Sequence, residues 1–155
     1  MPPEPNSAAY ALLLCGILQT VSAQLAIDVN QRLVVHTFSG VLTDADIAGL
    51  PARVRSHPDF DPTFSELLDF SGVTAGTIST SALDAVARSK SSFSRASLHV
   101  LIAPQDHIFG LARMAQVFAG ETRPNSAVVR TMEEAREILA LGKTGKTGAR
   151  PEQDR

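Results

Sequence analysis

Four histidines and a single cysteine are the side chains of this sequence that could hold a metal or act as a base or nucleophile. They are His36, His57, His99, His107 and Cys15. A zinc site needs several such ligands close together, typically as His-x-x-x-His or as paired cysteines, and no pair here has that spacing. We therefore expect no metal. His107 is kept as a candidate ligand contact, because it follows the most apolar strand, where α/β sheets bind ligands.

Two catalytic motifs are missing or incomplete. No Gly-x-Ser-x-Gly sequence occurs, so the nucleophile elbow of an α/β hydrolase is absent. Residues 142–148 look like part of a phosphate loop, but Ala140 stands where the first glycine should be, and no helix-forming segment follows. We expect no cofactor, no nucleotide binding and no enzymatic activity.

Polar side chains elsewhere could contact a ligand or a partner. The segment from Lys90 to Arg95 combines two cations, three hydroxyls and the ring of Phe93. It could bind an anionic headgroup or a protein, or it could be a polar loop with Phe93 packed into the core. Asp69 ends a short strand and could orient a base, although we favour a carboxylate that accepts hydrogen bonds from loop amides. Arg113 lies off the apolar stripe of its helix, which predicts a solvated side chain.

The composition places these residues in one globular domain. The chain has 155 residues, of which 44% are hydrophobic and 19% are charged, with a formal net charge of -2. This length is enough to bury a core without disulfides or metals. The charge balance argues against a broad nucleic-acid surface.

Apolar periodicity predicts alternating strands and helices. In chain order we expect a hairpin of strands near 25–29 and 33–38, a helix over 43–54 that Pro51 kinks or splits, a strand over 66–70, a helix from 81, a buried strand over 98–103, a helix from 106, a strand over 127–130 and a helix over 131–141. The expected helix caps are Thr43 or Asp44, Ser81 with Asp84, Asp106, and Thr131 with Glu134, and Gly142 is the expected end of the last helix.

This order, β-β-α-β-α-β-α-β-α, predicts an α/β fold. Helical crossovers place successive strands in parallel, so we expect a mixed, mostly parallel sheet of about five strands with helices packed on it. We expect the domain to span 25–141. Residues 1–24 are expected to be a non-core N-terminal extension, with a signal-like segment as the alternative, and 142–155 a flexible tail.

The sequence from Leu68 to Thr74, Leu-Asp-Phe-Ser-Gly-Val-Thr, resembles the strand and loop of STAS domains, the fold of bacterial anti-sigma-factor antagonists. Residues 32–44, 59–62 and 109–114 are more similar to the SpoIIAA-like branch, which is also grouped as STAS/SEC14-type. The resemblance covers about 25–141. It implies the STAS-like fold and a regulatory, non-catalytic module.

The resemblance also points to the start of one helix. In the antagonists, a serine there accepts a phosphate from a partner kinase. Here Ser79 stands in place of the family's aspartate and Ala82 in place of its glycine, which leaves Thr80 and Ser81 as the nearest hydroxyls. A phosphate would suit a helix N-terminus, but serine and threonine are also ordinary helix caps, and we favour the cap.

Two functions follow as hypotheses. The first is a regulatory module that binds a partner protein, and the second is a small-ligand or lipid-binding module of the SEC14-like type, which could act at a membrane surface. We expect a cytoplasmic protein, or an exported one if the N-terminal segment is a signal. We expect no transmembrane span. The protein could form a homodimer. The candidate ligand or partner contacts are Asp69, Ser71, Phe93, Arg95, His107 and Arg113.

Overall fold

The computed structural model describes residues 22–147, so the predictions for the segment before Ser22 and for the tail after Thr147 lie outside it. At its centre is a five-stranded sheet in the order β1-β2-β3-β4-β5. The strands are β1 (Ser22–Asp28), β2 (Leu33–Thr43), β3 (Ser65–Thr77), β4 (His99–Ile102) and β5 (Ser126–Val129). β1 runs antiparallel to β2, and all other pairs are parallel, which confirms the predicted mixed sheet.

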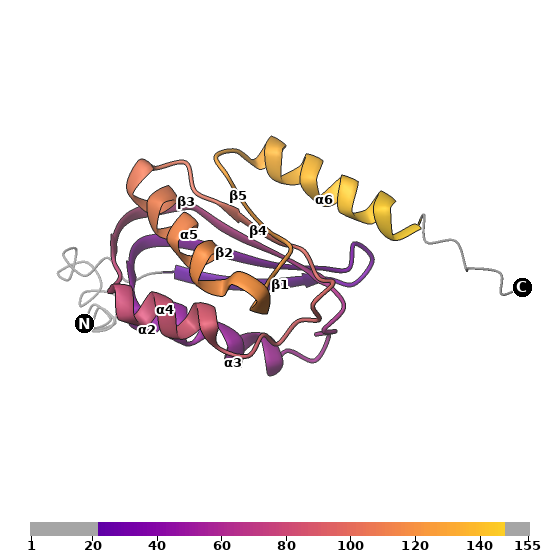
Figure 1. The fold of residues 1–155 in the computed structure, drawn as a ribbon, viewed down its shortest axis with the longest axis horizontal. Helices are drawn as coiled ribbons and strands as arrows, with labels where there is room; N and C mark the ends of the chain where they lie inside the picture. The colour runs from indigo at the N-terminus through magenta and orange to yellow at the C-terminus, as the bar shows by residue number, and fades with distance from the viewer. Residues whose placement is uncertain (1–21, 148–155) are drawn as a thin grey trace, which may run out of the picture.

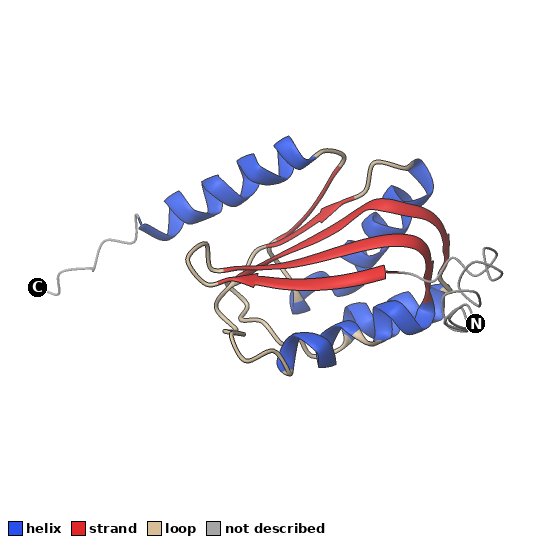
Figure 2. Ribbon diagram, turned by 180° about the vertical axis from the view of Figure 1, so that it is seen from behind, coloured by secondary structure: helices blue, strands red, loops and turns tan. Residues whose placement is uncertain are grey.

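The helices cover the two faces of the sheet unequally (Figures 1 and 2). They are α2 (Asp44–Ala48), α3 (Leu50–Arg55), α4 (Thr80–Arg88), α5 (Asp106–Ala119) and α6 (Met132–Thr147), with a short 3-10 helix η1 (Gly120–Thr122) after α5. The main core lies between the sheet and α2, α4 and α5, where Phe38, Phe70 and Ile108 are buried. A smaller core lies under α6.

Alternation along the strands decides which residues reach each core. In β4, Val100 and Ile102 face α6, whereas His99 and Leu101 face the larger helical layer. Both faces of this strand are therefore covered, which explains the continuous apolar run that predicted it.

β3 is much longer than predicted. The expected strand ended at Phe70, but pairing with β2 continues to Thr77 through two register shifts. The structure therefore places Asp69 within a strand rather than at its end. At Gly72 a Cβ atom would lie 2.8 Å from the carbonyl oxygen of Phe38, so this close approach of the two strands requires glycine.

Two of the predicted local signals are confirmed. Thr131 and Glu134 form a capping box at the start of α6, in which each backbone amide is bonded to the other side chain. The predicted first helix is split as Pro51 indicated, with the break at Gly49 and Pro51 in the first turn of α3.

Three predicted helix ends are wrong. The N-cap of α4 is Ser79 rather than Ser81, because Ser79 Oγ accepts the amide of Ala82 at 3.2 Å. The N-cap of α5 is Gln105, and Asp106 is the first helical residue. α6 continues through Gly142 to Thr147.

Ser79 holds the start of α4 against α2. Its amide donates to Asp44 Oδ1 at 2.7 Å, and its hydroxyl donates to Asp44 Oδ2 at 2.8 Å. Thr80 and Ser81 occupy the exposed first turn of α4, and the Ser81 hydroxyl contacts the Ser79 hydroxyl at 3.2 Å.

We predict that Ser79→Ala destabilises the protein by about 1 kcal/mol, because α4 loses its capping acceptor and Asp44 loses a donor. Ser81→Ala is the matched control, and its effect should stay within about 0.5 kcal/mol. Urea unfolding of the two variants measures both free energies. A larger loss in Ser81→Ala than in Ser79→Ala would contradict the assigned cap.

Candidate functional site

Three ionisable side chains lie together in the main core, one on each of the strands β2, β3 and β4. His36, Glu66 and His99 are 0%, 9% and 2% exposed. Glu66 is paired with His99 in the parallel register of β3 and β4, and His36 lies two residues beyond Val34, the register partner of Glu66 on β2. Strand pairing alone therefore brings the three side chains to one place.

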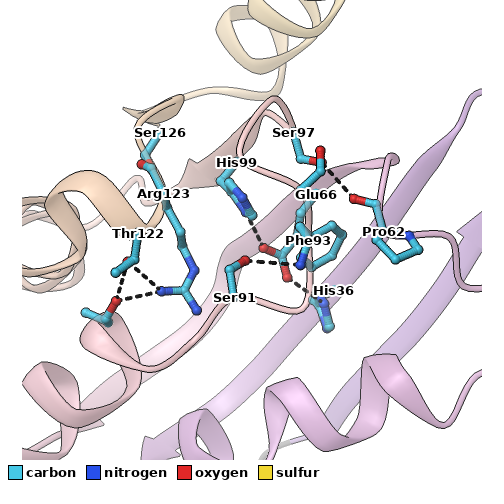
Figure 3. A network of polar contacts seen from close by, with 12 residues as sticks. His36, Pro62, Glu66, Ser91, Phe93, Ser97, His99, Thr122, Arg123 and Ser126 are labelled. Carbon is cyan, nitrogen blue, oxygen red and sulfur yellow. Dashed lines mark hydrogen bonds and ion pairs between the residues drawn. The ribbon is translucent and has the colours of Figure 1, made fainter.

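The Glu66 carboxylate lies between the two imidazoles (Figure 3). His99 Nδ1 lies 2.7 Å from Glu66 Oε2, and His36 Nε2 lies 3.1 Å from Glu66 Oε1. The Phe93 ring packs edge-on against His99, with the ring centroids 5.2 Å apart. We call His36, Glu66 and His99 the buried triad.

The histidines keep Glu66 ionised. Burial alone would raise the pKa of Glu66, but the His36 and His99 imidazoles beside its two oxygens outweigh it and lower the pKa to about 2. An ionised carboxylate is thus kept in the core by its two neighbours.

Glu66 and His99 of the buried triad border a cavity of about 140 Å³ between the sheet and the helices α2, α3, α4 and α5. Most of the lining side chains are aliphatic or aromatic, including Leu68, Phe70, Leu83, Ile108 and Leu111. The polar lining residues gather at one end of the cavity, where β3, β4 and β5 begin and α5 ends. They are Glu66, Ser92, His99, Gln116, Arg123 and Ser126.

Arg123 is the cationic side chain at this polar end. Its Nη1 donates to the carbonyl oxygen of Ala87 at 2.6 Å, in the last turn of α4. Burial lowers the pKa of the Arg123 guanidinium, while the charge of Glu66 opposes that effect. The cavity therefore combines a long apolar part with one polar end that carries an anion and a cation.

The predicted phosphoacceptors lie away from this cluster. Thr80 and Ser81 follow the end of β3, whereas Glu66 lies near its start. His107 is also at the far edge, in the first turn of α5, where its Nε2 lies 3.1 Å from the carbonyl oxygen of Gly76.

Of the predicted contact residues, Phe93 borders the cavity. Asp69 Oδ1 accepts the amide of Ser71 at 2.9 Å, so it bonds a backbone amide as expected, although within a strand. The side chains of Arg95 and Arg113 are exposed, and Arg113 Nη1 donates to Gln116 Oε1. The structure does not bring these candidates together as one site.

The triad itself was not predicted from the sequence. Its members stand singly in apolar strands, 30 or more positions apart, and no motif connects them. Their shared signal is a charged or imidazole residue inside a strand otherwise made of buried apolar residues.

Within residues 22–147, no group of three or more histidine, cysteine, aspartate or glutamate side chains is arranged to hold a metal ion. In the buried triad, each imidazole faces a different oxygen of Glu66. In the same part of the chain, every helix is too short or too polar to cross a bilayer.

No protein-family model matches the chain, and no curated protein matches it. Among solved structures, it is similar to an uncharacterised protein of the DUF3478 family, with a SpoIIAA-like fold, from Shewanella loihica PV-4. The two are 16% identical, the match covers 79% of this chain and 95% of that one, and the TM-score is 0.50. The fold is SpoIIAA-like.

This finding confirms the fold implied by the sequence resemblance. At this level of identity, the likeness carries the fold alone, and function has to be argued from the site. In this SpoIIAA-like domain, the start of α4 and the polar end of the cavity lie at opposite edges of the sheet.

The lowered pKa of Glu66 predicts acid sensitivity. Its carboxylate stabilises the fold above its ordinary pKa of 4.5, and this contribution is lost as the pH falls towards about 2. At about 1.4 kcal/mol per pKa unit, the loss is roughly 3 kcal/mol. We expect Glu66→Gln to remove most of this pH dependence, measured by urea unfolding at a series of pH values.

Glu134→Gln is the control, since hydrogen bonds from Arg130 and Thr131 also lower the pKa of Glu134, but its carboxylate is exposed on α6. This variant should keep most of the acid-dependent loss. If Glu66→Gln loses as much stability between pH 4.5 and 2 as the unaltered protein, the two histidines do not keep the Glu66 carboxylate ionised.

Proposed function

We propose that this protein is a non-catalytic regulatory module that binds a small, largely apolar molecule in the cavity between its sheet and its helices. The observation that carries the proposal is the 140 Å³ cavity within the main core, lined mainly by hydrocarbon side chains. Protein interiors are close-packed, so an apolar hollow of this size leaves hydrocarbon surface that a ligand could cover.

The size of the cavity sets the size of the ligand. An engineered core cavity of about 150 Å³ binds benzene, so the present one suits a single ring or a short aliphatic chain. This volume is too small for a whole phospholipid, which narrows the lipid-binding hypothesis to small apolar ligands.

An occupant of the cavity would stabilise the protein. The apolar lining lacks contact partners on the side that faces the hollow, and a ligand that fits would supply them, so binding and stability are coupled.

The SpoIIAA-like fold supports the regulatory part of the proposal, and an interaction with a partner protein stays a prediction. α2, α4 and α5 contribute to the walls of the cavity, and α4 also carries Thr80 and Ser81 on its exposed first turn. A ligand that favours one packing of these helices would shift the surface available to a partner. The cytoplasmic location likewise stays a prediction.

We expect toluene to bind the protein and Ala115→Leu to abolish this binding, because Ala115 lines the cavity and the added carbons would fill it. Saturation-transfer NMR on toluene gives the affinity. Ala85→Leu is the matched control, as Ala85 is exposed on α4 and does not line the cavity.

Both variants should be folded, which a thermal melt checks. Equal binding of toluene by Ala115→Leu and by the unaltered protein would contradict the proposed site. The same holds if the unaltered protein does not bind toluene at all.

A further inference from the structure

The polar end of the cavity offers a hydrogen-bond acceptor on His99. Its Nδ1 faces Glu66 Oε2 at 2.7 Å, so in the neutral ring Nδ1 carries the hydrogen and Nε2 is an acceptor. Among the described residues, Nε2 has no hydrogen-bond partner, although His99 is only 2% exposed and lines the cavity.

Arg123 offers donors at the same end. Its Nη1 contacts the carbonyl oxygen of Ala87 and the hydroxyl of Thr122, while its Nε and Nη2 have no partner among the described residues. Arg123 precedes Ser126 by three residues, and Ser126 is the register partner of His99. The loop before β5 therefore brings the guanidinium to the end of the cavity that His99 borders.

Two of the remaining polar side chains at this end already form hydrogen bonds within the protein. Gln116 donates to the carbonyl oxygen of Ser126 and accepts from Arg113. The Ser126 hydroxyl donates to the carbonyl oxygen of Arg123. Ser92 accepts from Arg55, which leaves its hydroxyl hydrogen and one lone pair.

The polar end already holds one negative charge. Glu66 is an ionised carboxylate there, and Arg123 is, among the described residues, the one cationic side chain beside it that lines the cavity. A ligand carboxylate would bring an uncompensated charge into the core beside Glu66, which is costly. A hydroxyl adds no charge and can both accept a hydrogen bond, which the Arg123 guanidinium can donate, and donate one, which His99 Nε2 can accept.

We infer that the molecule bound in the cavity is an uncharged amphiphile, a ring or short chain with one hydroxyl group held by His99 and Arg123. This inference rests on the proposed function, because it names the class of ligand for the same cavity. It also assigns a role to the polar end of the cavity, with which a purely apolar ligand would form no hydrogen bond.

Phenol, toluene and benzoate are matched probes for the test, since they share one ring and differ in their substituent. We expect phenol to bind more tightly than benzoate. Arg123→Met should weaken phenol binding about tenfold or more, as expected for the loss of a hydrogen bond from a charged donor, and should leave toluene within about twofold. Arg95→Met is the control, because Arg95 is exposed and does not line the cavity.

Arg123→Lys keeps a cationic donor, and we expect it to bind phenol more tightly than Arg123→Met. In the unaltered protein, the ¹⁵N resonance of His99 Nε2 should shift with phenol and not with toluene. This measurement needs no variant, so it holds even if Arg123→Met does not fold.

Equal losses of phenol and toluene binding in Arg123→Met would overturn the inference and leave the proposed function standing. Tighter binding of benzoate than of phenol, or a His99 Nε2 resonance that phenol does not move, would do the same. If none of the three probes binds, the proposed function falls, and the inference falls with it.

Discussion

The carboxylate of Glu66 is the constraint on which the main core depends. An ionised group in the interior is costly unless its oxygens are paired, and here both pairs come from neighbouring strands, His36 on β2 and His99 on β4. Strand periodicity is two, so a slip of one residue would turn a histidine to the other face of the sheet and leave the charge unpaired. The triad therefore favours a single register for the three central strands.

The order of elements could be predicted because it depends on local patterns. Apolar residues recur at helix or strand spacing, and Thr131 with Glu134 forms a cap from residues three positions apart. The length of β3 could not be predicted in this way. Residues 71–77 are mostly small or hydroxylated and resemble a loop, but they pair with β2 beyond Phe38, where Gly72 permits the close approach.

The buried triad also could not be predicted from local sequence patterns, because its members are far apart in the sequence. Glu66 and His99 are separated by 33 positions, and only the order and register of the strands bring them together. The cap of α4 gives a smaller example. Ser79 and Ser81 are equally good caps by residue type, and Asp44, 35 positions away on α2, bonds to Ser79. Phe93 could be found because an aromatic residue between cations stands out in one segment.

α4 connects the two edges of this sheet. Its first turn carries Thr80 and Ser81 and is tied to α2 through Ser79, and the Ala87 carbonyl near its other end accepts hydrogen bonds from Thr122 and Arg123. Leu83 and Ala87 line the cavity between these two ends. A ligand that engages Arg123 would therefore act on the same residue that holds the end of α4. α4 therefore lies between the cavity and the exposed hydroxyls at the opposite edge, and coupling between them would require two discrete positions of this helix.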